Sequence, residues 1–237
     1  MISLSAYMLR SYTRSQRYFA PFAGLLIMVL ILYSYKPNPV MNSYAATAVM
    51  LYIGCAWIGL SFLNHDHPVH RQVTVVHIRS SLKYNVGSIL TLAFLTLLLA
   101  LIVVIYPWIT GHFEESPGVY RFILALIGHG LLGLLGIAIS LYLQASWVRK
   151  SSHSVGIMLV IIILSLGATK ISNLVPEFLN VLIWILPPVS PVMDAMLNAD
   201  NLQFSNLMFP YVHALLYIVI LIGFYLYKAS YKDYNKT

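Results

Sequence analysis

Cysteine and charged side chains are scarce in this chain. Cys55 is the single cysteine, so no internal disulfide can form, and we interpret Cys55 as a small buried hydrophobic residue. Only 9% of the residues are charged, whereas 59% are hydrophobic. A soluble domain carries a far larger charged share, so this composition is typical of a polytopic α-helical membrane protein.

Motifs for nucleotide binding and catalysis are missing as well. The sequence has no phosphate loop of the GxxxxGK[ST] form and no HExxH zinc motif. No Asp or Glu lies in a segment long enough to span a bilayer, which argues against a carrier coupled to protons or sodium ions. We therefore predict that the chain is not an enzyme. Any ATP that drives it would have to bind another chain.

Long apolar runs occupy most of the sequence. A bilayer core about 30 Å thick requires roughly 20 apolar residues per helix. We predict six spans in a single transmembrane domain over residues 1–237. They are Phe19–Tyr35, Tyr44–Leu63, Val86–Tyr106, Phe122–Gln144, Val155–Ile171 and Tyr211–Tyr227.

Basic residues are concentrated in alternate gaps between these runs. Eleven of the fourteen precede the first span, lie between spans two and three or four and five, or follow the sixth. Most acidic residues lie in the other gaps. The positive-inside rule therefore predicts a multi-pass plasma-membrane protein with both termini in the cytoplasm. Anionic lipid headgroups account for the net charge of +7, so we predict no nucleic-acid partner.

Residues 3–18 have the pattern of an amphipathic helix on the membrane surface. Arg10, Arg14 and Arg17 can reach lipid headgroups from such a helix. The side chains expected to face lipid are Leu4, Tyr7, Met8, Tyr12 and Tyr18.

The loop between spans two and three, residues 65–85, is long for a simple connection. Val69, Val73 and Val76 would share one face of a short helix at its centre. The remaining positions would carry the charged and histidine side chains Arg71, His77, Arg79 and Lys83. Two interpretations stay open, a helix that docks a soluble partner and a helix that lies on anionic lipid.

Four histidines in this loop raise the question of a metal site. His65, His67 and His70 have the spacing HxHxxH, and imidazole suits zinc or copper. No cysteine is near, and Asp66 is the nearest carboxylate. We therefore predict no metal site. His129, near the centre of the fourth span, is interpreted as a structural residue with a backbone hydrogen bond.

Small residues distinguish the fourth span, because they let helix backbones approach closely in a membrane. The predicted packing residues are Gly128, Gly130, Gly133 and Gly136. The external segment 172–210 contains an apolar stretch, Val175–Leu186, that is too short to cross a bilayer and is followed by Pro187 and Pro188. We predict a re-entrant helical hairpin there.

This layout resembles the ABC-2 type permeases, the membrane subunits of ATP-driven exporters. The likeness consists of the amphipathic elbow, six spans with both ends inside, the long loop after the second span, and the external segment NLVPEFLNVLIWILPPVSP at 173–191. Within that family the chain is similar in size to small permeases that export amphipathic peptides from bacteria.

The resemblance implies functional residues at both membrane faces. A coupling helix at about Val69–Lys83 and a smaller contact at Trp147–Ser154 would dock a cytoplasmic ABC ATPase. The docking residues are Val69, Arg71, Val73, Val76, His77, Arg79, Lys83, Arg149 and Lys150. The external gate would comprise Pro176, Phe178, Trp184, Pro187 and Pro188.

The resemblance also implies a mechanism and partners. The permease would act in a pair, as a homodimer or with a related permease, and export amphipathic or hydrophobic cargo such as peptides. This chain would hold no cofactor, while the ATPase subunit would bind ATP and magnesium. The alternative is a membrane protein without transport activity, either a scaffold or immunity protein or a membrane enzyme.

Overall fold

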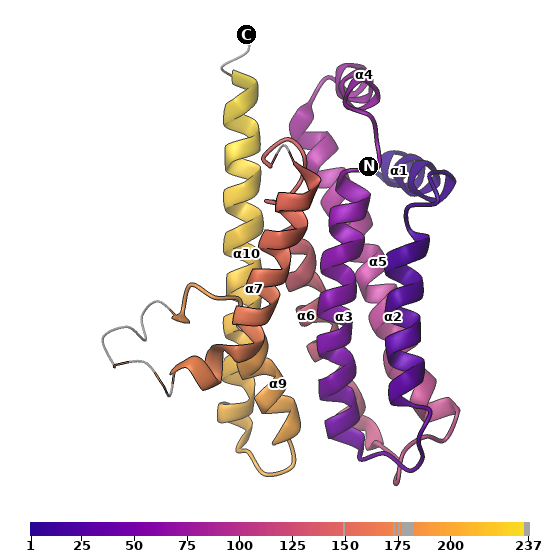
Figure 1. Ribbon diagram of the computed structural model, residues 1–237, viewed down its shortest axis with the longest axis vertical. Helices are drawn as coiled ribbons and strands as arrows, with labels where there is room; N and C mark the ends of the chain where they lie inside the picture. The colour runs from indigo at the N-terminus through magenta and orange to yellow at the C-terminus, as the bar shows by residue number, and fades with distance from the viewer. Residues whose placement is uncertain (149, 173, 175, 177–182, 235–237) are drawn as a thin grey trace.

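The computed structural model describes residues 1–148, 150–172, 174, 176 and 183–234, and over these residues the chain is all-helical (Figure 1). An isolated bridge between Asn38 and Phe113 is the one β interaction within them. The helices are α1 (Ile2–Arg14), α2 (Phe19–Leu32), α3 (Val40–Leu63), α4 (Pro68–Ile78), α5 (Ser81–Ile109), α6 (Gly118–Ser140), α7 (Ser151–Ser172), α9 (Val189–Leu197) and α10 (Phe204–Tyr234).

Among the described residues, five helices are long and apolar enough to cross a membrane, namely α3, α5, α6, α7 and α10. Helix α2 has 14 residues and is about 21 Å long, which is short of a bilayer core. It meets the criteria for a span only together with α1, from which it is bent by 83°. The chain is thus an all-helical, multi-pass membrane protein with five to six candidate spans, as predicted at this level.

The ends of the helices divide the molecule into two faces. Helices α1 and α4, the start of the chain and the end of α10 lie at one end of the bundle, here called the termini end (Figure 1). The turns 33–39 and 110–117 lie at the opposite end (Figure 1). The start of α1 and the end of α10 therefore lie at the same end of the bundle (Figure 1).

Helix α1 lies across the termini end and packs on the protein. Its buried side chains are Met8 and Tyr12, each 2% exposed. Tyr12 contacts Phe62 and His65 edge-on, with ring centroids 5.2 and 5.4 Å apart. The prediction that Met8 and Tyr12 face lipid is therefore wrong. An amphipathic pattern reveals an apolar side, but it cannot distinguish lipid from a neighbouring helix.

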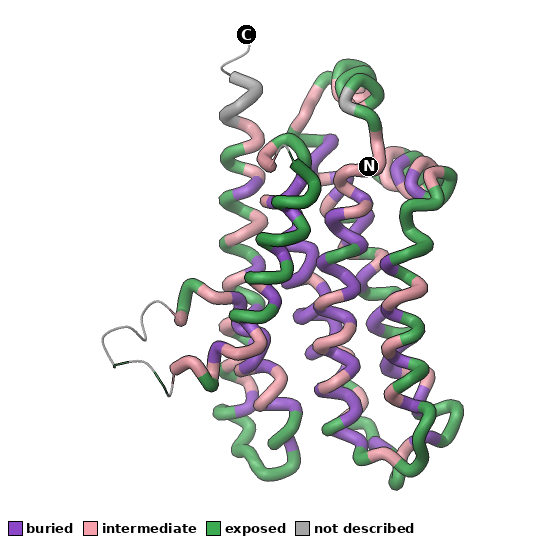
Figure 2. Tube along the Cα trace, viewed as in Figure 1, coloured by how far each residue is buried: buried purple, intermediate pink, exposed green. Residues whose placement is uncertain are grey.

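Helices α3 and α6 form the centre of the bundle, and most of their residues are buried (Figure 2). A methyl group on Gly136 would collide with the backbone of α3 at Tyr52 and Ala56. In the same contact, a methyl group on Gly59 would collide with Ser140 of α6. Glycine is required here because it has no side chain to hold the two backbones apart.

The other glycines of α6 face different neighbours. A Cβ on Gly133 would lie 2.5 Å from Thr96 of α5, and one on Gly128 would lie 2.7 Å from Met196 of α9. A Cβ on Gly130 would lie 3.5 Å from its nearest neighbour, the Leu97 side chain of α5, which is an ordinary contact. The small residues of this helix thus adjoin α3, α5 and α9 rather than one partner.

Several element boundaries differ from the predicted ones. Ser80 caps α5 by accepting a hydrogen bond from the Lys83 N–H (3.2 Å), so α5 begins five residues before the predicted span. Arg79 ends α4 in the left-handed conformation (φ 55°), which separates the two helices. Lys83 consequently belongs to α5, and the predicted helix Val69–Lys83 is too long. Helix α6 ends at Ser140 rather than Gln144, and α10 begins at Phe204 rather than Tyr211.

The segment between α7 and α10 contains a helix that we did not predict from the residue pattern. Helix α9 begins directly after Pro187 and Pro188, where we expected a helix to end. Pro191 in its first turn costs no hydrogen bond, since the N–H groups of that turn have no partner inside the helix. Its buried residues Val189, Val192 and Met196 pack among the spans. Most of the predicted stretch Val175–Leu186 lies outside the described residues.

The opposite end is held together by contacts between its turns. The Asn38 N–H donates to the His112 carbonyl (2.9 Å), and the Glu114 N–H donates to the Asn38 carbonyl (3.0 Å). Arg121, at the start of α6, pairs with Glu115 and, at 2.9 Å, with Asp200 after α9. Burial lowers the pKa of His112.

Substitution of Gly136 by alanine is expected to destabilise the protein. The added methyl must push α3 and α6 apart, and overpacking of this kind costs roughly 1–3 kcal/mol. Unfolding can be followed by reaction of the buried Cys55 thiol with a maleimide dye during heating. The control is Gly223→Ala in α10, where a methyl meets no atom within 4 Å. Equal midpoints for the two variants would contradict the close α3–α6 contact.

Candidate functional site

Local sequence explains why α4 forms at the termini end. His67 precedes it in an extended conformation, and its ring Nδ1 accepts a hydrogen bond from the Val69 N–H (3.4 Å). Pro68 follows at the first helical position, where its fixed φ favours a helix. The left-handed Arg79 then stops the helix. Residues 68–78 therefore fold as a separate short helix between two spans.

One face of α4 presents three valines to the surroundings. Val69, Val73 and Val76 are 57%, 63% and 74% exposed. Val75 and Ile78, on the other side, pack against the core cluster that includes Met8 and Tyr12. Around the valines, His77 and Arg79 are also exposed, as is Lys83 on α5. We call Val69, Val73 and Val76 the valine ridge.

Arg71 points away from the valine ridge and into the protein. Its Nη1 donates to Gln144 Oε1 at 3.1 Å, and its Nη2 donates to Asn85 Oδ1 at 3.4 Å. The guanidinium also lies 5.3 Å from the centroid of the Tyr84 ring. Arg71 is thus placed to hold α4 on the bundle, whereas the other predicted docking residues of α4 lie on its outer surface.

Three buried polar groups complete a network around Arg71. Gln144 Nε2 donates to the Tyr225 hydroxyl (2.8 Å), and that hydroxyl donates to Asn85 Oδ1 (3.2 Å). Gln144, Asn85 and Tyr225 are 1%, 5% and 2% exposed. The network joins α4 to α5, to the segment after α6, and to α10. Any movement of α4 that preserves these bonds must carry parts of α5, of α10 and of the segment after α6 with it.

A cavity of about 750 Å³ lies beside this network. Arg71, Asn85, Gln144 and Tyr225 contribute its polar lining, together with Asn64 and Asp66. Apolar walls come from the end of α3, from α4 and α10, and from the 141–148 segment. Their residues are Leu63, Val75, Val76, Ala145, Trp147 and Ala229. We call this space the Arg71 cavity.

The second predicted docking contact is described only in part. Lys150 is exposed at the termini end, and Arg149 lies outside the described residues. Trp147 lines the Arg71 cavity instead of projecting from the surface. The Lys228 ammonium lies 5.3 Å from the centroid of the Trp147 ring. A second cation therefore stands next to the cavity wall.

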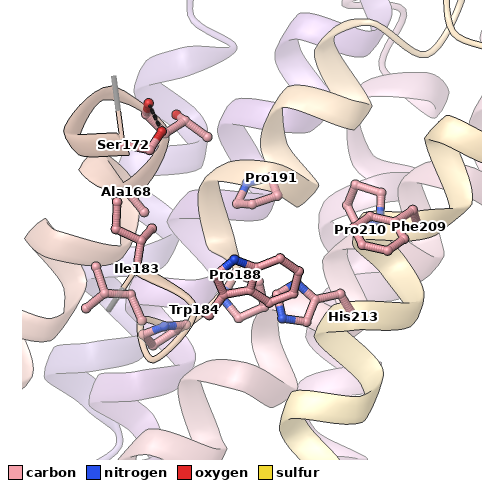
Figure 3. Close-up of a pocket in the computed structure, with 12 residues that line it drawn as sticks. Ala168, Ser172, Ile183, Trp184, Pro188, Pro191, Phe209, Pro210 and His213 are labelled. Carbon is pink, nitrogen blue, oxygen red and sulfur yellow. Dashed lines mark hydrogen bonds between the residues drawn. The ribbon is translucent and has the colours of Figure 1, made fainter. Parts of the chain in front are cut away.

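Residues of the predicted external gate line a smaller, mostly apolar cavity of about 220 Å³. Trp184, Pro187 and Pro188 form part of its wall, and Phe209 and His213 of α10 line it as well (Figure 3). The Trp184 and His213 rings lie 4.9 Å apart. Pro176 is exposed and does not line this cavity, and Phe178 lies outside the described residues.

Histidines do not gather into a metal site within the described residues. His65 Nε2 lies 3.1 Å from Asp66 Oδ1, which also accepts a hydrogen bond from Ser11 (3.0 Å). His129 is fully buried, hydrogen-bonded to Thr47 and to the backbone carbonyl of Ala125. Both nitrogens of His129 are therefore engaged, as its structural interpretation expects.

No protein-family model, curated protein or solved structure matches this chain. The fold establishes the class, a multi-pass helical membrane protein, and leaves the particular activity to be inferred from the site.

Sequence reasoning missed three members of the network. Gln144 was assigned to the end of a span, Asn85 to the end of a loop, and Tyr225 to the interior of the last span. Each stands as a polar group near the boundary of an apolar run, which is a weak signal. Their common partner became visible only when the fold brought them to Arg71.

Tyr225→Phe is expected to destabilise the protein. The variant removes two hydrogen bonds, while Gln144 Nε2 still donates to the Leu141 carbonyl and Asn85 Oδ1 still accepts from Arg71. Each lost hydrogen bond contributes about 0.5–1.5 kcal/mol to stability. The Cys55 thermal assay should show a lower midpoint. Tyr227→Phe on the same helix is the matched control, because Tyr227 is 67% exposed and should change stability little. A Tyr225→Phe midpoint equal to that of Tyr227→Phe would refute the network.

Proposed function

We propose that the chain is the membrane-spanning permease subunit of an ATP-driven ABC exporter. A separate cytoplasmic ATPase would bind ATP and magnesium and dock on the termini end. The permease would act as a pair, formed by two copies or by one copy and a related permease. Its cargo would be amphipathic or hydrophobic, with peptides as the favoured class. In this proposal the termini end is cytoplasmic and the membrane is the plasma membrane.

The valine ridge is the observation that carries the proposal. Three exposed valines on one face of a short helix outside the spans are costly in water and become favourable when a partner covers them. The helix is held on its other side by Val75, Ile78 and Arg71. A firmly attached helix with an uncovered apolar face suits a docking element for a soluble protein.

The network around Arg71 supports a role in transmission. A docked ATPase that shifts α4 would pull on Gln144 and Asn85 through the guanidinium. Tyr225 extends the same connection to α10. Such a chain of hydrogen bonds offers a physical route from the docking surface to α5, to α10 and to the segment after α6.

Photocrosslinking tests the docking proposal directly. A photoreactive amino acid at Val73 is expected to crosslink, in native membranes, to a protein that contains the GxxxxGK[ST] motif. Incorporation at Thr13, an exposed residue of α1 at the same end, is the control. Products containing only lipid would favour the helix that lies on the membrane surface. If the chain is stably produced but crosslinks to no ATPase, the result would favour the scaffold or enzyme alternative.

Val73→Asp is expected to release the ATPase from detergent-solubilised complexes. The substitution places a charge at the centre of the apolar interface, while its effect on stability should be small because the side chain is 63% exposed. The measurement is how much of the ATPase identified by photocrosslinking co-purifies with the variant. Thr13→Asp adds the same charge elsewhere on this end and should retain the ATPase. Retention by Val73→Asp as well would refute docking on the valine ridge.

A further inference from the structure

Arg71 carries a charge that no carboxylate neutralises within the described residues. The ion pairs among them are His65 with Asp66 and Arg121 with Glu115 and Asp200. The partners of Arg71 are neutral amide oxygens, at 3.1 and 3.4 Å. A half-buried guanidinium favours an anionic partner, because a charge-assisted hydrogen bond to an oxyanion is stronger than one to an amide. The network positions the cation without neutralising it.

The Arg71 cavity has the dimensions of a ligand site. Its volume, about 750 Å³, lies within the range of roughly 300–1,000 Å³ found for small-molecule pockets. A polar region around Arg71 adjoins walls formed by Val75, Trp147 and Ala229. One side can therefore hold a charged head, and the other can cover an apolar body.

Other charges around the cavity favour an anion. Asp66 lines the cavity, but its Oδ1 is engaged by Ser11 and lies beside His65. Lys228 stands next to the Trp147 wall and adds a second positive charge. The charged side chains at the cavity are thus Arg71 and Asp66 in its lining and Lys228 beside the Trp147 wall, two cations and one anion.

We propose that the Arg71 cavity binds a single-chain amphiphile through an anionic carboxylate head. The carboxylate accepts hydrogen bonds from the guanidinium of Arg71, and the apolar chain lies against Val75, Trp147 and Ala229. As a cargo-entry site this inference rests on the proposed exporter function, because it assigns a charge and a shape to the cargo. The binding itself requires no ATPase.

Binding can be measured on the purified permease alone, in a neutral detergent. A variant with Trp57, Trp108 and Trp184 replaced by phenylalanine retains Trp147, which lines the cavity. Titration with dodecanoate should change the Trp147 fluorescence in a saturable manner. Dodecyltrimethylammonium, a cation with the same chain length, should produce no saturable change.

Arg71→Gln should raise the half-saturating dodecanoate concentration at least about tenfold, because the loss of a charge-assisted hydrogen bond usually weakens binding by about that factor. Lys83→Gln removes a charge from the same end outside the cavity lining and should leave binding unchanged. Ala229→Phe keeps Arg71 but fills the cavity, so it should also weaken binding. This second variant keeps the test valid if Arg71→Gln does not fold.

Three outcomes would overturn the inference. They are equal dodecanoate binding by Arg71→Gln and Lys83→Gln, binding of the cationic amphiphile, and saturation by phosphatidylglycerol in place of dodecanoate, which would assign the cavity to a lipid headgroup. The proposed function fails separately. Dodecanoate binding without a Val73 crosslink to an ATPase would refute the exporter and retain the site. A crosslinked ATPase without dodecanoate binding would refute the site alone.

Discussion

The close approach of α3 and α6 is the contact on which the rest of the bundle depends. Gly136 allows the α6 backbone to lie against Tyr52 and Ala56, and Gly59 receives Ser140 in return. In a bilayer, lipid chains are as apolar as leucine, so helices gain stability from tight packing rather than from leaving water. Helices α5 and α9 pack against the same central helix at Gly133 and Gly128. The positions of three other helices thus follow from small residues on one.

Polar chemistry at the termini end depends on that arrangement. Because α6 ends at Ser140, the following segment turns and brings Gln144 under α4. The start of α5 then supplies Asn85, and the C-terminal half of α10 supplies Tyr225. These groups hold Arg71 on the inner side of a helix whose outer side carries exposed valines. A single short helix therefore combines a surface suited to a partner with a cation that faces a cavity.

Much of the layout could be read from residue patterns. Apolar runs indicated the spans, and the basic gaps placed both termini on one side. Val69, Val73 and Val76 were recognised as one face of a helix from their spacing alone. Helix boundaries were harder to predict from the sequence. The break between α4 and α5, for example, depends on the left-handed conformation of Arg79 and on the capping hydroxyl of Ser80. The pattern did not predict α9, because a pair of prolines such as Pro187 and Pro188 can either end a helix or precede the start of one.

The sequence by itself determined the class of this protein, its helical spans and the shared side of its termini. The helical spans follow from the cost of exposing backbone polar groups to lipid, which depends on local composition. The shared side of the termini is a prediction from the basic residues in alternate gaps. Only the tertiary structure decided which way each amphipathic residue faces. Met8 and Tyr12 pack inward and Arg71 turns away from the valine ridge, because contacts with distant segments determine the orientation of a side chain. The Arg71 cavity exists for the same reason, since its lining comes from five separate parts of the chain.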